Sequence, residues 1–397
     1  MSTTAGSRTA WLLTRLRIWD GERTLDADTV KIADGRIQQI GTAEDLARDT
    51  AKRIDCSGLW AMPGLIDAHV HLELDPERRE PPARGEAPDR DRMIERAGRM
   101  LRAGITSARD LGGGSGAELW LRDAINRGEV SGPRLWCAGQ PITTPGGHCH
   151  FWGGEAGSTA AALAVLERQI EKGSDLIKVM ASGGVMTRNT KPADAQFEQD
   201  TLDAIVAAAR AASLTVAAHC HSTLSIDRAA RAGVRTIEHC SWVGPDGWGK
   251  GYDAKVVEHM LTNRIWVSPT INLGWQRHLT NSDSTRRDQL RAIFSDMRER
   301  GVPLIASTDA GIPGVHHQDL PKALPVMQQL TGLSTEATLR SATSEAARGI
   351  GFPAGGWLRV GEPADLLLVD GDPTADLSVL AQPVEVYKAG RAVLNAH

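Results

Sequence analysis

Eight short apolar runs recur along the middle of the chain, and segments of helical character separate most of them. Runs such as 176–181 lack polar alternation, which is typical of parallel strands buried on both faces. Helical patterns at 197–212 and 284–300 illustrate the alternation. The pattern predicts an α/β protein with a (β/α)8 TIM-type barrel over residues 63–351. The predicted strands are 64–71, 105–111, 134–141, 176–181, 214–219, 236–240, 265–269 and 303–309.

Both chain ends have a different pattern, in which short alternating strands are bounded by turns. Asp20-Gly21 and Asp34-Gly35 separate such strands near the start, which indicates hairpins. Residues 364–369 and 384–388 have the same character near the end. We expect 1–62 and 352–397 to pair into one small β-sandwich domain beside the barrel.

Composition narrows the class of protein further. A net charge of -4 over 397 residues gives no basic surface for nucleic acid. No stretch approaches the roughly 20 apolar residues of a membrane helix, and the apolar run at 10–13 is too short for a signal peptide. We expect a cytoplasmic protein that binds neither nucleic acid nor a membrane. The five cysteines are scattered and odd in number, which favours packing over disulfides.

The ends of the predicted strands carry the residues with chemical interest, because reactive groups of such barrels lie there. The first strand ends in His69-Val70-His71, and residues two apart share one face of a strand. The fourth strand contains Lys178 within an apolar run. Burial favours the neutral amine, which can take up CO2 and become a bridging carbamate. The alternative is a lysine that reaches solvent from the strand end.

The fifth, sixth and eighth predicted strands end in His219, His239 and Asp309. Each has an ordinary structural explanation when taken singly. Together with the two earlier histidines and the lysine they form an ordered set of imidazole, amine and carboxylate groups. Imidazole and carboxylate are the ligands expected for zinc or a similar divalent ion. The joint pattern therefore predicts a metal site at the barrel mouth.

These residues carry a resemblance to a known family. The stretch PGLIDAHVH at 63–71, the four later positions and the tail GEPADL at 361–366 resemble the amidohydrolase superfamily. The stretch KVMASGG at 178–184 and Gly146-Gly147-His148 are similar to its imidazolonepropionase-like subgroup. That subgroup of binuclear metal hydrolases contains Xaa-Pro dipeptidases, ochratoxinase-like amide hydrolases and relatives acting on carbamates or ureas.

The resemblance implies a role for each ligand. His69 and His71 would bind one metal with Asp309, His219 and His239 would bind the second, and carboxylated Lys178 would bridge the two. Zinc is the expected ion, although Mn, Fe or Co fit the same ligands. Two such ions lower the pKa of water to about 7, so that hydroxide held between them can attack an amide. Asp309 would accept the proton and pass it to the leaving nitrogen.

Other polar residues after the strands are candidates for substrate binding. The resemblance places a carbonyl-binding histidine at His148, and His150 is the alternative. His221 follows His219 by two positions and faces the same pocket, where several dipeptidases have tyrosine. Asp67 is expected either to orient a ligand histidine or to act as a cap.

Arginine and tryptophan residues near the mouth complete the set. Arg188 is expected to bind a substrate carboxylate or to be solvated. Tryptophans after barrel strands suit an apolar or aryl substrate group, with packing between loops as the alternative. The indoles considered are Trp152, Trp242, Trp248 and Trp275.

These features favour a binuclear hydrolase that cleaves an amide or carbamoyl C–N bond of a small molecule. N-acyl amino acids, dipeptide-like compounds, aryl amides, carbamates and ureas are the classes considered. The first alternative is a deaminase or cyclic-amide hydrolase, although mononuclear deaminases of the superfamily generally lack the bridging lysine. A non-enzymatic scaffold is the second, which the retention of all six ligands disfavours. A homo-oligomer is expected.

Overall fold

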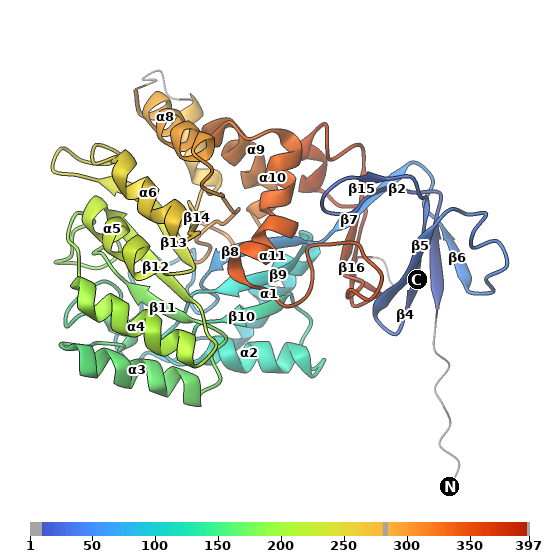
Figure 1. The fold of residues 1–397 in the computed structure, drawn as a ribbon. Coiled ribbons are helices and arrows are strands. Elements are labelled where there is room, and N and C mark those ends of the chain that lie inside the picture. Colours follow the sequence, from blue (N-terminus) through green and yellow to red (C-terminus); the bar gives the residue numbers. More distant parts are fainter. Residues whose placement is uncertain (1–9, 281–284, 395–397) are drawn as a thin grey trace, which may run out of the picture.

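The computed structural model describes residues 10–280 and 285–394. Figure 1 shows two parts: a larger one in which strands alternate with helices, and a smaller one made mostly of strands from both ends of the chain. The predicted α/β class is confirmed, because parallel strands and helices alternate through the larger part.

The smaller part consists of two sheets. Its strands are β1 (Trp11–Thr14), β2 (Arg17–Trp19), β3 (Thr24–Leu25), β4 (Thr29–Ala33), β5 (Arg36–Gly41), β6 (Lys52–Asp55), β7 (Leu59–Pro63), β15 (Leu366–Asp370), β16 (Glu385–Lys388) and β17 (Arg391–Ala392). One sheet has the order β5-β4-β1-β6 and the other β17-β16-β15-β7-β2-β3. β7 pairs antiparallel with β15, so the two chain ends share a sheet. The boundaries 1–62 and 352–397 stay a prediction, and residues 1–9 and 395–397 lie outside the described residues.

Seven parallel strands form the centre of the larger part. They are β8 (Leu65–Val70), β9 (Ile105–Asp110), β10 (Arg134–Cys137), β11 (Ile177–Met180), β12 (Val216–Ser222), β13 (Thr236–Val243) and β14 (Trp266–Ser268). They are joined as two sheets, β10-β9-β8 and β11-β12-β13-β14. Every residue of β8, β9, β11 and β12 is buried, as expected for strands covered on both faces.

The eighth predicted strand, 303–309, is not a regular strand. Single parallel bridges join Leu304 to Val267 and Ala310 to Val70, so this segment lies between β14 and β8. Pro303 has no N–H to donate, and Asp309 has a left-handed φ of 61° that ends any extended run. On the other side, the bridge between Ile142 and Val179 links the two sheets. The regular hydrogen bonding therefore stops short of one closed eight-stranded sheet.

Helices surround the parallel strands. They are α1 (Arg90–Arg102), α2 (Ala117–Asn126), α3 (Thr159–Glu171), α4 (Gln199–Ala211), α5 (Thr223–Ala232), α6 (Ala254–Thr262), α7 (Gln276–Thr280), α8 (Thr285–Glu299), α9 (Leu320–Thr331), α10 (Thr335–Ser341), α11 (Ser344–Ile350) and the short 3-10 helices η1 (His150–Trp152), η2 (Leu273–Trp275) and η3 (Leu377–Ala381). The predicted helices 197–212 and 284–300 correspond to α4 and α8, and position 284 lies outside the described residues.

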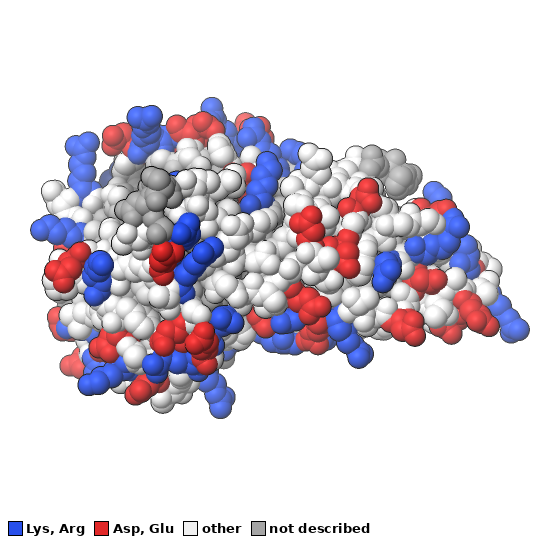
Figure 2. Space-filling view, turned by 90° about the horizontal axis from the view of Figure 1, so that it is seen from above, with Lys and Arg blue, Asp and Glu red and all other residues white. Residues whose placement is uncertain are grey.

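The surface carries charges of both signs. On the face seen in Figure 2, basic and acidic side chains are interspersed, so no extended field of one sign covers it. Within residues 10–280 and 285–394, no helix is long and apolar enough to cross a membrane.

Candidate metal centre

A cavity of about 1010 Å3 opens where the parallel strands end. One histidine lies in β8 and the next just after that strand, the lysine lies in β11, one histidine each in β12 and β13, and the aspartate follows segment 303–308. Each predicted ligand lines this one cavity although they span some 240 positions of sequence. The six residues are His69, His71, Lys178, His219, His239 and Asp309.

The first cluster within this cavity comprises His69, His71 and Asp309. The two Nε2 atoms lie 3.2 Å apart, and Oδ1 of Asp309 lies 3.2 Å from His69 Nε2 and 3.5 Å from His71 Nε2. Ligand atoms about 2.0–2.1 Å from one tetrahedral zinc ion are separated by roughly 3.3–3.4 Å. The spacing therefore fits a shared divalent cation.

Hydrogen bonds on the far side of each ring orient these imidazoles. His69 Nδ1 lies 2.9 Å from Oε2 of Glu238, and His71 Nδ1 lies 2.8 Å from the carbonyl oxygen of Gly112. A carboxylate and a carbonyl can only accept, so each Nδ1 carries the proton and each Nε2 presents its lone pair to the other. Two facing lone pairs are stabilised by a cation between them.

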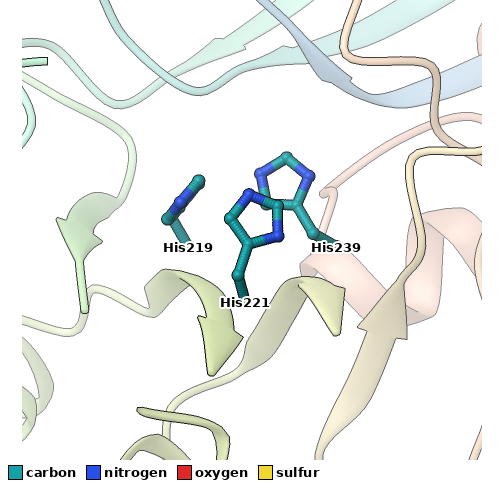
Figure 3. Close-up of side chains that lie close together, drawn as sticks. All are labelled: His219, His221 and His239. Carbon is teal, nitrogen blue, oxygen red and sulfur yellow. The ribbon is translucent and has the colours of Figure 1, made fainter. Parts of the chain in front are cut away.

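The second cluster consists of three imidazoles. Figure 3 shows His219 and His221 of β12 and His239 of β13, with their rings turned toward the same space. Their ligand atoms lie within 4.8 Å of one another. The rings of His221 and His239 stack with centroids 4.7 Å apart. This cluster has the donor set and the spacing for a metal ion, with His221 as an additional imidazole next to the two predicted ligands.

The partners of the second cluster differ from those of the first. His219 Nε2 donates to the carbonyl oxygen of Gly183 at 3.2 Å, which leaves Nδ1 as the lone-pair atom. His239 Nδ1 lies 2.9 Å from the hydroxyl of Thr270, and His221 Nδ1 lies 2.9 Å from the hydroxyl of Ser241. Neutral groups thus orient this cluster, whereas a carboxylate orients His69.

Protonation states in the cavity suit metal binding. Burial lowers the pKa of His69, and it lowers the pKa of His219 and His239 well below the usual value. Burial alone would raise the pKa of Asp309, but the neighbouring imidazoles, His69 first, hold that pKa well below its usual value. Neutral imidazoles and an ionised carboxylate are the forms that coordinate metals.

The amine of Lys178 has a buried environment that shifts it toward its neutral, reactive form. Its side chain is buried in β11 and lines the cavity. Burial lowers its pKa, while the charges of Glu238 and Asp309 act in the opposite direction. Burial therefore shifts the amine toward its neutral form, which is the form that reacts with CO2.

His148 and His150 both line the cavity, but at different depths. His148 is buried, and its ring lies 4.5 Å from that of His219. A Cβ on Gly184 would lie 2.3 Å from the His148 ring, so this glycine makes room for it. Burial lowers the pKa of His148 to about 3, and the ring is neutral. His150 is half-buried, and its Nδ1 lies 3.1 Å from the Gly147 carbonyl oxygen.

The tryptophan predictions need correction. Trp242 is fully buried against Tyr252, with ring centroids 4.9 Å apart, and it does not line the cavity. Its φ of 52° turns the side chain into the core, so the prediction of substrate contact is wrong. Trp152 packs against His71, with ring centroids 5.2 Å apart, and it lines a neighbouring cavity. It therefore supports the predicted metal ligand His71 instead of facing the mouth. Trp248 and Trp275 do line the main cavity.

The outer part of the cavity is basic. Arg188 lines it with a side chain 89% exposed, and a Glu80 carboxylate oxygen lies 3.9 Å from the guanidinium. Arg79, Arg277 and Arg286 also line the rim. Asp67 does not orient an imidazole. Its carboxylate accepts from the backbone N–H groups of His69 and Thr308 and so joins β8 to the irregular eighth segment.

Sequence reasoning missed Glu238 and Arg109. Both side chains are buried, and Arg109 Nη2 donates to Glu238 Oε1 at 2.8 Å. Burial alone would raise the pKa of Glu238, but Arg109 first and His69 next hold it below its usual value. The available signal was the same as for Lys178: charged residues within apolar strands are costly unless they are paired.

Known proteins resemble this chain over most of its length. The profile of the amidohydrolase family matches residues 60–393. Ochratoxinase of Aspergillus niger is 27% identical over 416 aligned residues, which cover 94% of this chain and 84% of the relative. The crystal structure of a Xaa-Pro dipeptidase with methionine bound in its active site is 26% identical with a TM-score of 0.80, covering 96% of this chain and 99% of the other.

A prolidase structure in complex with N-methylphosphonate-L-proline is 28% identical with a TM-score of 0.80, and it covers 97% of this chain and 99% of the other. The chain therefore belongs to the amidohydrolase family. Its interpretation as a hydrolase of C–N bonds, and its resemblance to the ochratoxinase and Xaa-Pro dipeptidase subgroup, are confirmed.

Proposed function

We propose that this protein is a binuclear metal-dependent hydrolase of an amide or carbamoyl C–N bond in a small molecule. The observation that supports it most is the convergence of four imidazoles, one carboxylate and one buried amine on one cavity. The two clusters lie next to each other, since the ligand atoms of His239 are also within 4.8 Å of those of His69 and Asp309. Lys178 as a carbamate would be the ligand common to both. Zinc is the expected metal, with Mn, Fe or Co as substitutes.

The chain's own residues account for the remaining chemistry. Two divalent ions, when bound, would lower the pKa of water to about 7 and polarise a substrate carbonyl. Asp309 is ionised and faces the cavity, so it can take a proton from the attacking water and pass it to the leaving nitrogen. Such transfer is worth about 10²–10⁴-fold. His148 can donate an N–H to the carbonyl oxygen, where negative charge develops.

The rest of the cavity describes the substrate. Val185, Trp248 and Trp275 give the outer wall apolar surface, which suits an alkyl or aryl group. Arg188 and Arg277 on the rim can pair with a substrate carboxylate. His221 belongs to the second cluster and its ring also lies 5.1 Å from that of Trp248, so it would contact the group next to the scissile bond. N-acyl amino acids and dipeptide-like compounds combine these features.

A cyclic-amide hydrolase is the second candidate. One stretch of the chain is 36% identical over 92 residues to imidazolonepropionase of Acidiphilium cryptum, which covers 23% of this chain. The reaction would use the same water activation on a ring amide, so only the substrate test separates the two candidates.

The experiment combines metal analysis with a substrate panel. Protein purified without chelators should contain two divalent ions per chain and hydrolyse N-acyl amino acids or dipeptides. Lys178→Ala should hold fewer ions and lose activity, and Lys178→Met, which keeps the length of the side chain without the amine, should behave alike. An enzyme that is fully active after removal of all divalent ions would contradict the proposal. Turnover restricted to cyclic amides would support the second candidate.

The proposal extends to the fold. We infer that the bridges at Ile142, Leu304 and Ala310 complete a (β/α)8 barrel, which the family neighbours with TM-scores of 0.80 support. The cytoplasmic location and the homo-oligomeric state stay predictions.

A further inference from the structure

Glu238 lies behind the first cluster, at the far side of the His69 ring, and does not line the cavity. It lies on β13 directly before His239, and its side chain is completely buried. Alternation along a strand would point two neighbours to opposite faces. Here His239 has a left-handed φ of 65°, so both side chains turn into the barrel interior. The backbone is therefore distorted where a carboxylate is brought beneath the first cluster.

Three groups contact this carboxylate. Oε2 accepts from His69 Nδ1 at 2.9 Å, while Oε1 accepts from Arg109 Nη2 at 2.8 Å and from the Thr236 hydroxyl. Arg109 also donates from Nε to the carbonyl oxygen of Ala68 at 2.7 Å. The guanidinium thus holds the backbone beside His69 while the carboxylate holds its ring.

A buried ion pair is a poor source of stability, because desolvation offsets its attraction. Its effect on His69 is more specific. An ionised carboxylate can only accept, and Arg109 is always protonated, so Nδ1 of His69 must carry the ring proton. Nε2 is then left as a lone pair aimed at His71 and Asp309. Partners of this kind typically change metal affinity 10–100-fold.

We propose that Glu238, held by Arg109, is a positioning residue that fixes the tautomer and orientation of His69 for metal binding. The inference rests on the proposed metal-dependent function. The proposed role of Glu238 concerns the first cluster only, because other groups orient the second. The Gly183 carbonyl oxygen orients His219, and the Thr270 hydroxyl orients His239. Loss of Glu238 should therefore weaken one metal site and leave the other intact.

Glu238→Gln tests this with little change in shape. The amide oxygen will turn to Arg109, because two donors cannot face each other, and the amide N–H will then face His69 Nδ1. That arrangement favours the wrong tautomer. Metal-free protein is titrated with Co²⁺ against a competing chelator, with the visible absorption of bound Co²⁺ recorded. We expect one of the two binding steps to weaken about 10–100-fold and the other to keep the wild-type affinity.

Asp365→Asn is the matched control. Asp365 is also a buried carboxylate paired with two cations, Lys388 at 2.6 Å and Arg134 at 3.2 Å, but it does not line the cavity. Both variants should be less stable, and only Glu238→Gln should lose metal affinity. Arg109→Lys keeps the charge without the planar fork and should shift the same step to a smaller extent, which provides the test if Glu238→Gln does not fold.

If Glu238→Gln binds Co²⁺ in two steps with the affinities of the wild-type protein, and differs only in lower thermal stability, the pair is only structural and the inference is overturned. Absence of metal binding in the wild-type protein would overturn the proposed function itself, and this is measured without any variant. The two failures are therefore distinguishable.

Discussion

At the scale of single residues, His148 tests the proposed stabilisation of the carbonyl oxygen. His148→Phe keeps a ring against His219 and removes the N–H donor. Loss of one such donor costs about 10²–10³ in kcat, so we expect this decrease with KM and metal content little changed. Because the pKa of His148 is about 3, the ring is neutral at all working pH values, and the limbs of the pH–rate profile should not move.

His150→Phe is the matched control for that measurement. His150 is half-buried and farther out in the same loop, so its replacement should change kcat much less. A larger effect of His150→Phe than of His148→Phe would assign the donor role to His150 and contradict the proposal.

The irregular backbone of β13 separates the site residues that could be predicted from the sequence from those that could not. The ligand histidines and Asp309 were predictable, because each is a polar residue near the end of an apolar run, and Lys178 was predictable as a charged residue within such a run. Glu238 was not, because the neighbour of a ligand on a strand is expected to face away from the site. Trp242 was expected after a strand that ends at 240, whereas β13 continues to Val243. His239 and Trp242 both have left-handed φ values, and the register between β12 and β13 shifts near Cys220. The periodicity of a sequence does not indicate such a local distortion of the backbone.

At the scale of elements, the apolar runs located the strands well and their ends less well. The run 176–181 contains β11, and 105–111 contains β9. The run 134–141 is strand only to Cys137, because Gly139 has a left-handed φ and Pro141 cannot donate to a neighbour. Hydrophobicity identifies a buried segment, whereas its hydrogen bonds depend on partners that are distant in sequence.

The start of α2 holds a buried carboxyl group whose energetics can be tested. Glu118 is fully buried, and its carboxyl group lies against that of Glu73, to which the protonated acid can donate a hydrogen bond. Burial first, and then the nearby carboxylates of Glu73 and Asp110, raise its pKa well above 4.5. The folded protein therefore keeps a proton that the unfolded chain releases above about pH 4.5, and this contribution to stability is lost as the pH rises.

Glu118→Gln replaces the protonated acid with a neutral group of the same size. At pH 4 we expect the variant and the wild-type protein to have similar free energies of unfolding. As the pH rises to 8 the variant should become the more stable, by an amount that grows with pH. Urea denaturation at several pH values measures this. A variant that is equally stable or less stable than wild type at pH 8 would show that Glu118 is ionised in the folded protein.

At the scale of the whole molecule, the junction between the β unit and the barrel could be anticipated only in outline. Strand patterns at both ends indicated that they would pair, and β7 and β15 do so. The sequence did not reveal β1 and β6, which run parallel, since their pairing joins segments about forty residues apart. Nor did it reveal the polar contacts that join the two parts.

Asp365 is the centre of those contacts. It accepts from Lys388 Nζ at 2.6 Å and from Arg134 Nη2 at 3.2 Å, and Lys388 also donates to the carbonyl oxygen of Thr106 in β9. The tail of the chain is thereby bonded to the first strands of the barrel. Burial alone would raise the pKa of Asp365, but Lys388 and Arg134 hold it below 3.8. Its stabilising effect is therefore complete above pH 3.8 and declines as the pH falls below that value.

Asp365→Asn should leave the half-buried Lys388 without its counter-charge, and removing one partner of a buried pair typically costs about 3–5 kcal/mol. We expect the free energy of unfolding at pH 7 to decrease by that amount while metal affinity and KM stay at wild-type values. The difference between the proteins should shrink as the pH falls below 3.8, because unfolded wild-type protein then takes up a proton at Asp365 that the folded protein binds only at lower pH. Unchanged stability at pH 7 would show that the pair does not hold the β unit to the barrel. A parallel loss of metal binding would show that the junction and the catalytic cavity are coupled.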